Sequence, residues 1–385
     1  MIHRNICHIS RSIYPSNISA HKQNILNFRA WLKIWSNIVV IAQSEQKSLV
    51  KSSEKNIQGI FLPLKKNRYL NVIFFTICGF NKARKLNREL NFDLFQASDV
   101  GGAIMALSLS KFYKKKFLFE VQGDIFDYPG KVGGHFHSFL VKKISRFIAK
   151  RADYIRIVSP FLYQPLDKIG IKRDKIFLVA PRCDSNIFNS KNKYDKPHCY
   201  ETEKKNIVFV GNLLIAKGVD ILLDAFSELC LTRNDLRLIF VGDGIEINQL
   251  KKIASLRGIA KKVIFEGRKD YLDIPKYIYH ADVLVLPSIE EGVGRVLIES
   301  MALKTPVIGS KVGGIPYLIE DNKDGLLFDV ANIKELKKKI SLMIDNKSFA
   351  ETISENAYMK YKKYYDFDIS METYLEMYKS ILKDR

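Results

Sequence analysis

Residues 287–299 carry the side chains whose types and spacing point most clearly to chemistry. The segment places one carboxylate at Glu291 and another at Glu299, with Gly292 and Gly294 between them. The glycines let backbone N–H groups approach an anion at the start of a helix, a favourable position for a diphosphate. The two carboxylates, as hydrogen-bond acceptors, could bind hydroxyl groups at both ends of an elongated polyol. Glu299 as an ordinary surface glutamate is the alternative, and the surrounding glycines disfavour it.

An apolar strand is predicted just before this segment, at residues 283–286, and a helix through Glu299 to residue 303. In doubly wound folds, ligands bind at the carboxyl ends of the strands, where this segment lies. Similar strands recur along the chain, at residues 6–9, 37–42, 94–97, 117–121, 154–158, 176–180, 207–210, 236–241, 263–266 and 306–309. The predicted fold class is α/β: two doubly wound, Rossmann-like domains whose parallel sheets face a central cleft.

Helical patterns separate these strands, and they are expected at residues 21–34, 70–90, 102–112, 136–149, 219–230, 247–257 and 358–382. The apolar run at 70–80 carries Asn71 and is about half the ~20 residues that span a bilayer, so a buried helix is expected there. The polar, lysine-rich stretch before residue 206 resembles an interdomain linker. The predicted parts are an N-terminal domain, a linker, a C-terminal domain and a helix returning to the first domain, at residues 1–188, 189–205, 206–357 and 358–385.

The bulk composition describes a soluble globular protein that has 385 residues, enough for two domains of ordinary size. Hydrophobic residues make up 47% and charged residues 27%, which disfavours both disorder and a membrane-spanning protein. The five cysteines are scattered and form no CxxC pair. They indicate reduced thiols in the cytoplasm and argue against a disulfide framework or a zinc site. No secretory signal pattern is seen at the N-terminus.

The charge is distributed unevenly along the chain. Residues 1–190 hold 31 Lys and Arg against 12 Asp and Glu, a net +19, which leaves +2 of the total +21 for residues 191–385. A half this basic indicates a polyanionic partner: an anionic membrane leaflet, a diphosphate-linked substrate or nucleic acid. The alternative is a general bias towards lysine in the composition, but such a bias would have given both halves of the chain an excess of positive charge.

The order strand–PS–xx–EGxGxxxxE in residues 283–299 resembles the E-x7-E signature of retaining glycosyltransferases of family 4 (group 1), which have the GT-B fold. Further motifs of that family follow in order at residues 206–330: VGNL with Lys217 and Gly218, FVGDG at 240–244, FEG at 265–267, TPV at 305–307, VGGIP at 312–316 and DGLL at 324–327. The first half is similar more loosely, through DLFQA at 93–97, FEVQGD at 119–124 and VAPRCD at 179–184.

This resemblance implies that residues 1–188 form an acceptor-binding domain and residues 206–357 a nucleotide-sugar-binding domain. It also implies a role for individual residues. Glu291 would contact hydroxyls of the donor sugar and Glu299 the ribose, while Lys217 would neutralise the diphosphate of the leaving nucleotide. The expected catalytic residues are Glu291, Lys217 and Gln122. The expected donor-binding residues are Glu299, Gly292, Val293, Gly294, Arg295, Val296, Asn212, Gly267 and Arg268. The nucleotide-sugar is a co-substrate, and neither a cofactor nor a metal is expected.

The chain departs from the family pattern at several positions. Asn212 stands where an arginine is usual beside the diphosphate, and Arg182 or Arg295 could compensate. Gln122 replaces a histidine near the reaction centre and can donate a hydrogen bond but carries neither charge nor proton. Tyr317 replaces the glutamate after IP, and residues 16–19 replace the usual glycine-rich loop. No general base is expected, because the leaving phosphate would take the proton of the attacking hydroxyl.

The predicted helix at 136–149 is basic and amphipathic, with Lys142, Lys143 and Arg146 among phenylalanines and isoleucines. It could lie in a lipid headgroup region, or it could be an ordinary domain helix with its apolar face in the core. Together with the basic half, it favours a protein in the cytoplasm, peripheral on the inner face of the cell membrane. The expected partners are a nucleotide-sugar donor, a lipid-linked oligosaccharide acceptor and the anionic membrane surface, and not nucleic acid.

The expected function is therefore transfer of a hexosyl unit from a UDP- or GDP-sugar, with retention, to a hydroxyl of a growing bacterial surface polysaccharide. Two alternatives share the fold: a nucleotide-sugar epimerase, and a degenerate protein that binds the nucleotide-sugar without turnover. A nucleic-acid-binding protein is a third alternative, for which the sequence shows no helix-turn-helix, zinc or RNA-recognition signature.

Overall fold

The structure is a computed structural model that describes residues 4–14, 22–126, 134–201 and 203–384, without the side chains of residues 22, 23, 68, 69 and 134–137. The chain forms two compact units, Met1–Val179 with Met371–Arg385 and Ala180–Ser370. The chain thus enters the second unit after Val179, and residues 189–205 lie inside that unit. The boundaries predicted for the functional domains remain predictions. The replaced glycine-rich loop at residues 16–19 lies outside the described residues.

In the described part of the first unit, the strands form an eight-stranded sheet in the order β3-β4-β2-β1-β5-β6-β7-β8. Its strands are β1 (Asn5–Ile13), β2 (Asn37–Ser44), β3 (Val50–Glu54), β4 (Ile57–Pro63), β5 (Leu94–Ala97), β6 (Lys116–Val121), β7 (Tyr154–Ile157) and β8 (Ile176–Leu178). Every neighbouring pair is parallel except β3 and β4, which pair antiparallel. The six strands predicted in this half are confirmed. The β3–β4 hairpin was missed, because β3 is a half-exposed edge strand with one apolar residue.

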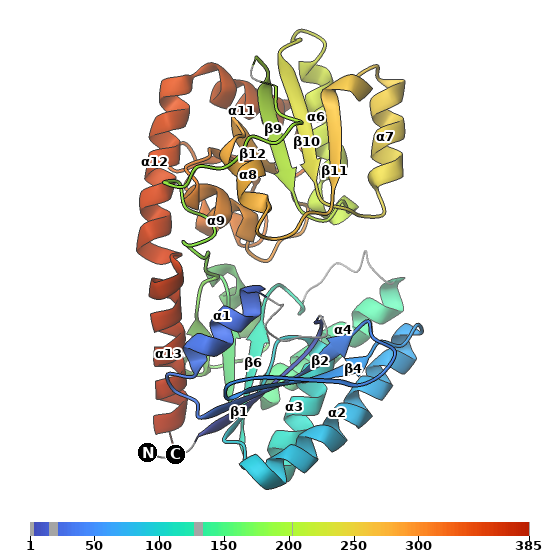
Figure 1. Cartoon of the computed structure of the whole chain (residues 1–385), viewed down its shortest axis with the longest axis vertical. Coiled ribbons are helices and arrows are strands. Elements are labelled where there is room, and N and C mark those ends of the chain that lie inside the picture. The colour runs from blue at the N-terminus through green and yellow to red at the C-terminus, as the bar shows by residue number, and fades with distance from the viewer. Residues whose placement is uncertain (1–3, 15–21, 127–133, 202, 385) are drawn as a thin grey trace. The chain divides into compact units, whose positions relative to one another are not determined.

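Helices flank this sheet (Figure 1). They are α1 (Lys22–Trp31), α2 (Arg68–Leu90), α3 (Val100–Tyr113), α4 (Gly134–Arg151), α5 (Tyr163–Lys168) and most of α13 (Phe367–Lys383). α2 packs on α3 and α3 on α4, whereas α1 meets α13 through the stacked rings of Trp31 and Tyr374, 5.3 Å apart. None of the described helices is long and apolar enough to cross a membrane.

The prediction of a wholly buried helix at residues 70–80 is wrong. Phe75 and Asn71 of α2 are buried, but Leu70, Ile73 and Ile77 are 60%, 55% and 57% exposed. The sequence window is apolar on both faces, so composition alone does not distinguish the face that meets the sheet from the opposite one.

A buried polar network fixes α13 to the first sheet. Arg156 on β7 donates to the Glu120 carboxylate on β6 over 2.9 Å, and Tyr374 of α13 also donates to Glu120. Gln96 on β5 donates to the Tyr374 hydroxyl over 3.0 Å and accepts from Tyr378 over 2.7 Å. Burial acts to raise the pKa of Glu120, but Arg156 and its hydrogen bonds outweigh burial and the pKa is lowered. The chain end is therefore held by paired polar groups as well as by aromatic packing.

In the described part of the second unit, six strands form a fully parallel sheet in the order β11-β10-β9-β12-β13-β14. They are β9 (Lys205–Val210), β10 (Leu236–Val241), β11 (Val263–Gly267), β12 (Val283–Leu286), β13 (Val307–Ser310) and β14 (Leu326–Phe328). After β9, the chain adds β10 and then β11 on one side of it. It then returns to the other side of β9 and adds β12, β13 and β14. The point between β9 and β12 is where such sheets bind ligands. The five strands predicted here are confirmed, and the three-residue β14 is an addition.

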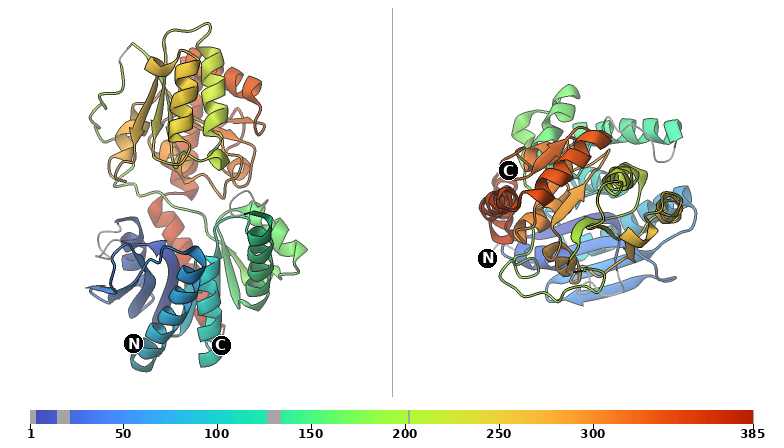
Figure 2. Two further views of the ribbon diagram at one scale, coloured as in Figure 1. Left: turned by 90° about the vertical axis from the view of Figure 1, so that its right-hand side faces the viewer. Right: turned by 90° about the horizontal axis from the view of Figure 1, so that it is seen from above.

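Helices cover both faces of this second sheet. They are α6 (Val219–Leu229), α7 (Ile247–Leu256), α8 (Ile274–Tyr279), α9 (Arg295–Ala302), α10 (Ile315–Leu318), α11 (Ile333–Asp345) and α12 (Lys347–Tyr364). Figure 2 shows α6 and α7 side by side, and α11 packs against α6. On the other side, α9 contacts α8 and α12.

The single helix predicted at 358–382 is in fact the end of α12 and the whole of α13. The break falls at Tyr365 and Asp366, where Cys183 donates its N–H to the Tyr365 carbonyl over 3.0 Å and bridges Asp366. The Asp366 carboxylate then accepts from the N–H of Asp368 at the start of α13. A contact with a distant segment therefore interrupts a helical pattern that is continuous in the sequence.

Candidate functional site

Two loops meet at the switch point of the second sheet. The loop after β9 contains Lys217, and the loop after the neighbouring strand β12 contains Glu291. The N–H groups of Ile289 and Glu290 both donate to the carbonyl of Ala216, over 2.9 and 3.1 Å. These bonds bring the two loops together at the carboxyl edge of the sheet, where the sequence predicted residues 287–299.

Lys217 and Glu291 form the centre of this site. The Lys217 Nζ lies 2.6 Å from Glu291 Oε2, with 27% and 13% of the two side chains exposed. The Ser288 hydroxyl donates to the same carboxylate oxygen over 3.3 Å, and the Gly292 N–H donates to Oε1 over 3.0 Å. Ser310, at the end of β13, fixes Ser288 in turn by donating to its carbonyl over 2.5 Å. A half-buried ammonium is thus held beside an oriented carboxylate, one ready for an anion and the other for hydroxyl donors.

Two glycines allow the backbone to pack this closely. Gly218 has φ +64°, and a Cβ there would lie 1.9 Å from the carbonyl oxygen of Pro287. Gly313, in the loop after β13, has φ +56°, and its Cβ would lie 1.8 Å from the carbonyl oxygen of Glu291. Both positions therefore need glycine for conformation and for space. At these two glycines, the loops that follow β9 and β13 pack directly against the loop that follows β12.

The N-terminus of α9 faces the residues that follow Glu291. Gly294 is its N-cap, in the left-handed region at φ +80°, and no side chain caps the helix there. Val293 is buried, Val296 is half-buried and Arg295 is exposed at the first helical position. Amides at the start of a helix and a cation beside them favour an anionic ligand. The predicted amide series from Gly292 to Val296 is therefore continuous with the Lys217–Glu291 pair.

Glu299 lies on α9, 8% exposed, in a different environment from Glu291. The Tyr271 hydroxyl donates to its Oε1 over 3.2 Å, and an Arg295 guanidinium nitrogen lies 3.9 Å from the same oxygen. Burial raises the pKa of Glu299, while Arg295 and Tyr271 oppose that rise. Burial also raises the pKa of the nearby Cys183 thiol, and the Glu299 charge adds to the effect. Folding thus disfavours the charged form of the Glu299 carboxylate. A pKa perturbed in this way is typical of residues at functional sites.

The other predicted residues lie at neighbouring strand ends or elsewhere. Asn212 is exposed directly after β9, and Gly267 closes β11 with φ +71° and accepts from the Gly242 N–H over 2.9 Å. Arg268 follows as an exposed side chain. Gln122 belongs to the first unit, exposed after β6. The role predicted for Gln122 therefore remains a prediction.

Sequence reasoning missed Ser310 and Tyr271, and it quoted Ser288 without a role. Ser288 and Ser310 follow strands that end at the same edge, and that placement was a usable signal. Tyr271 lies 28 positions from Glu299, in an irregular stretch, so no spacing rule connects the two residues. Among the described residues, no group of three or more His, Cys, Asp or Glu side chains is placed to hold a metal ion.

Part of the chain is similar in sequence to known glycosyltransferases. The family model described as glycosyl transferases group 1 matches residues 190–360. An uncharacterized glycosyltransferase of Methanocaldococcus jannaschii is 31% identical over 220 residues, which are 57% of this chain and 57% of that relative. The matched part is thus little more than half of that relative's length.

Solved structures extend the likeness to the whole chain. The sucrose-phosphate synthase of Thermosynechococcus elongatus superposes with a TM-score of 0.83 at 17% identity, over 100% of both chains. The HepE protein of Anabaena, solved with UDP and glucose, gives a TM-score of 0.77 at 17% identity, over 98% of this chain and 100% of HepE. At such identities the likeness is one of fold, and it confirms the predicted GT-B architecture of two α/β units with largely parallel sheets.

Proposed function

Because residues 190–360 form a group 1 glycosyltransferase domain on a GT-B fold, we propose that this protein transfers a hexosyl unit from a UDP- or GDP-sugar to an acceptor hydroxyl, with retention of anomeric configuration. The observation that carries the proposal is the Lys217–Glu291 pair, 2.6 Å apart at the switch point of the second sheet. HepE, which shares the fold, was crystallised with UDP and glucose, and this supports a nucleotide-sugar as the donor.

In the proposed complex, the donor diphosphate lies between Lys217 and the first amides of α9. Its arrival turns the Lys217 ammonium from Glu291 towards the phosphate oxygens, because a diphosphate carries more negative charge than one carboxylate. Glu291 is then released to accept hydrogen bonds from the sugar hydroxyls, and Glu299 accepts from the ribose hydroxyls. The ion pair of the free protein is in this sense a preformed, charge-balanced site.

The reaction follows from this placement of charge. The acceptor oxygen forms a bond to the anomeric carbon on the face from which the phosphate oxygen departs. The bond between that carbon and the phosphate oxygen breaks, and the leaving phosphate takes the hydroxyl proton. Lys217 and the α9 amides stabilise the negative charge that develops on the diphosphate. No side-chain nucleophile and no metal are needed in this scheme, so a chelator is expected to leave the rate unchanged.

The acceptor proposed is a growing, lipid-linked bacterial surface polysaccharide at the inner face of the cell membrane. The +19 of residues 1–190 supports an anionic surface as partner. On α4, Phe139 and Phe147 are 51% and 50% exposed, and their rings lie under Lys143 and Arg151. Exposed aromatic rings with adjacent cations suit a headgroup region.

The test is mass spectrometry of products from a panel of nucleotide-sugars incubated with lipid-linked acceptors extracted from membranes. The proposal predicts an acceptor heavier by one hexosyl residue and an equal amount of released nucleoside diphosphate. An epimer formed from donor alone would identify an epimerase instead. Calorimetric binding of the donor without turnover on any acceptor would identify a degenerate binding protein.

A further inference from the structure

The outward face of α2 carries a line of exposed aliphatic side chains. Leu70, Ile73 and Ile77 follow at spacings of three and four residues, so they share one face of the helix. We call these three residues the α2 ridge. Their exposed fractions of 55% to 60% are large for branched aliphatic side chains on a helix that has a buried face of its own.

The buried face of α2 lies on the opposite side. Asn71, Phe75, Gly79, Ala83 and Asn87 are buried at spacings of four residues. Gly79 permits the close approach, since a Cβ there would lie 2.7 Å from the Met105 sulfur on α3. The helix is therefore already fixed to its own unit through this face. In the part of the chain that the structure describes, the α2 ridge remains largely exposed and is therefore an additional surface.

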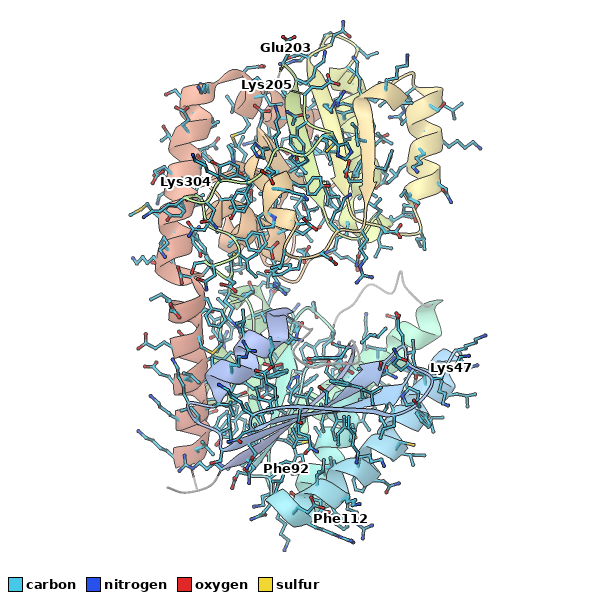
Figure 3. All side chains as sticks on the ribbon, viewed as in Figure 1. Lys47, Phe92, Phe112, Glu203, Lys205 and Lys304 are labelled. Atoms are coloured by element: carbon cyan, nitrogen blue, oxygen red, sulfur yellow. The ribbon has the colours of Figure 1, made fainter. Side chains whose placement is uncertain are left out.

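Cations extend the same face and surround it. Arg84 and Arg88 continue the line of the ridge through the last turns of α2, and both are exposed. Residues 65–90 contain seven Lys and Arg against one acidic residue, Glu89. The exposed Phe112 of α3 joins this surface, with its ring 5.7 Å from the Arg84 guanidinium (Figure 3). Apolar and cationic groups are thus presented together from Leu70 to Arg88, over about five turns of helix.

We propose that the α2 ridge and its flanking cations dock the protein on an anionic lipid bilayer, with α2 lying along the surface. Branched aliphatic side chains gain by entering the acyl boundary, while the arginines and lysines meet lipid phosphates. This inference deepens the membrane association proposed above and rests on it, but it assigns the contact to a specific helix face. It does not depend on which sugar is transferred.

Charge favours the bilayer over the other possible occupants. A second copy of the chain would bring the same cations against one another, which opposes a symmetric contact. A nucleic acid would satisfy the cations but would leave Leu70, Ile73 and Ile77 against phosphates and water. An anionic bilayer offers phosphate and hydrocarbon within one side-chain length, and so complements both parts of the surface.

The experiment is cosedimentation of the full chain with vesicles of phosphatidylglycerol and phosphatidylcholine, compared with vesicles of phosphatidylcholine alone. The ridge variant is Leu70→Gln, Ile73→Gln and Ile77→Gln, since glutamine keeps helix propensity. The matched control is Leu231→Gln, Ile245→Gln and Leu256→Gln, three aliphatic residues of the second unit that are 84%, 82% and 77% exposed. We expect the ridge variant to bind anionic vesicles about tenfold more weakly or worse, and the control to bind like the wild type.

A charge variant provides a second measurement if the ridge variant folds poorly by circular dichroism. Arg84→Gln, Lys85→Gln and Arg88→Gln should weaken binding and flatten its salt dependence, unlike Lys252→Gln, Lys261→Gln and Lys338→Gln. Wild-type binding by both the ridge and the charge variants would overturn the docking surface alone. Failure of the wild type to bind anionic vesicles would overturn membrane association as well, and leave sugar transfer standing. A dimer in sedimentation equilibrium that the ridge variant abolishes would show an interface between copies instead.

Discussion

At the residue scale, the two carboxylates of the proposed donor site, Glu291 and Glu299, lie in different electrostatic environments. Glu291 is held by an ammonium, a hydroxyl and an amide, so its charge is compensated within the site. Glu299 is buried with one tyrosine hydroxyl near it and a guanidinium nitrogen at 3.9 Å, and its pKa is raised. In the free protein, the charged form of Glu299 is therefore less stable than it would be in water. A ligand that donates hydroxyl hydrogen bonds there would recover part of that stability.

Glu299→Gln should separate stability from binding. The native pKa of Glu299 lies above its unfolded value, so the group costs stability as pH rises through that pKa, and the neutral amide removes the cost at pH 7. We expect an unchanged or higher thermal midpoint and donor affinity about tenfold to a hundredfold lower, since a charged acceptor is lost. Calorimetry with UDP and GDP and thermal unfolding measure the two effects. Glu228→Gln, an exposed glutamate of the same unit, is the control and should keep wild-type affinity.

At the element scale, the donor site depends on loops that only glycine allows to approach. Gly313→Ala should cost more activity than Gly258→Ala, although both glycines have positive φ, +56° and +68°. An added Cβ meets the Glu291 carbonyl oxygen at 1.8 Å in the first case and nothing within 4 Å in the second. Both variants should lose about 1 kcal/mol of stability from backbone strain. Only Gly313→Ala should lower the rate of sugar transfer, by about tenfold or more, because it displaces Glu291. Equal rates in both variants would contradict the assigned loop geometry.

Most of the parallel strands could be predicted from the sequence because they are short apolar runs that are largely buried. Two others, β4 and β14, were missed although they are also parallel and largely buried. β3 could not be predicted, since Val50–Glu54 is half-exposed at the sheet edge and lacks that signal. The break between α12 and α13 was equally hidden, because Cys183, which holds it, is distant in sequence. Patterns within one element are visible in a sequence, whereas contacts between elements are not.

His8, on β1 of the first sheet, should make the stability of the protein depend on pH. Burial lowers the pKa of His8, and Arg156 adds to this, whereas Glu120 and Asp99 act in the opposite direction. The unfolded chain therefore takes up this proton at a higher pH, about 6.5, than the native protein does, so stability falls as pH drops through that range. The loss should approach about 1.4 kcal/mol per pH unit at most. Denaturant unfolding at pH 7 and 5.5 measures it: His8→Gln should flatten the dependence, and the exposed His198→Gln should not.

At the scale of the whole molecule, the excess positive charge and the residues proposed to bind the donor belong to different halves of the chain. The basic excess belongs to residues 1–190, and the donor residues lie beyond them. If the excess serves an anionic surface, vesicle binding by the wild type should fall steeply as salt rises from about 0.05 to 0.5 M, since screening shortens the Debye length. Nucleotide binding should change little over the same range, because Lys217 is partly buried. Salt-independent binding to anionic vesicles would contradict this division.

The proposed donor site was more predictable than the surface proposed for membrane docking. Lys217 and Glu291 sit in short loops at fixed strand ends, so motif spacing alone places them side by side. The residues of the α2 ridge were predicted to be buried because they are hydrophobic, but hydrophobicity alone does not show whether a side chain packs in the core or lies on the surface. The exposed face of α2 therefore could be recognised only in the structure.

The central claim is that the Lys217–Glu291 pair is where the sugar is transferred, and a paired comparison tests it most directly. Nucleoside diphosphate release is measured with donor and lipid-linked acceptor for Lys217→Ala and Glu291→Ala. The matched pair is Lys337→Ala and Glu228→Ala, an ion pair of the same unit joined over 2.8 Å. We predict that the first two variants lose at least about a hundredfold in rate while staying folded, and that the matched pair keeps the wild-type rate. Wild-type rates in Lys217→Ala and Glu291→Ala would contradict the account.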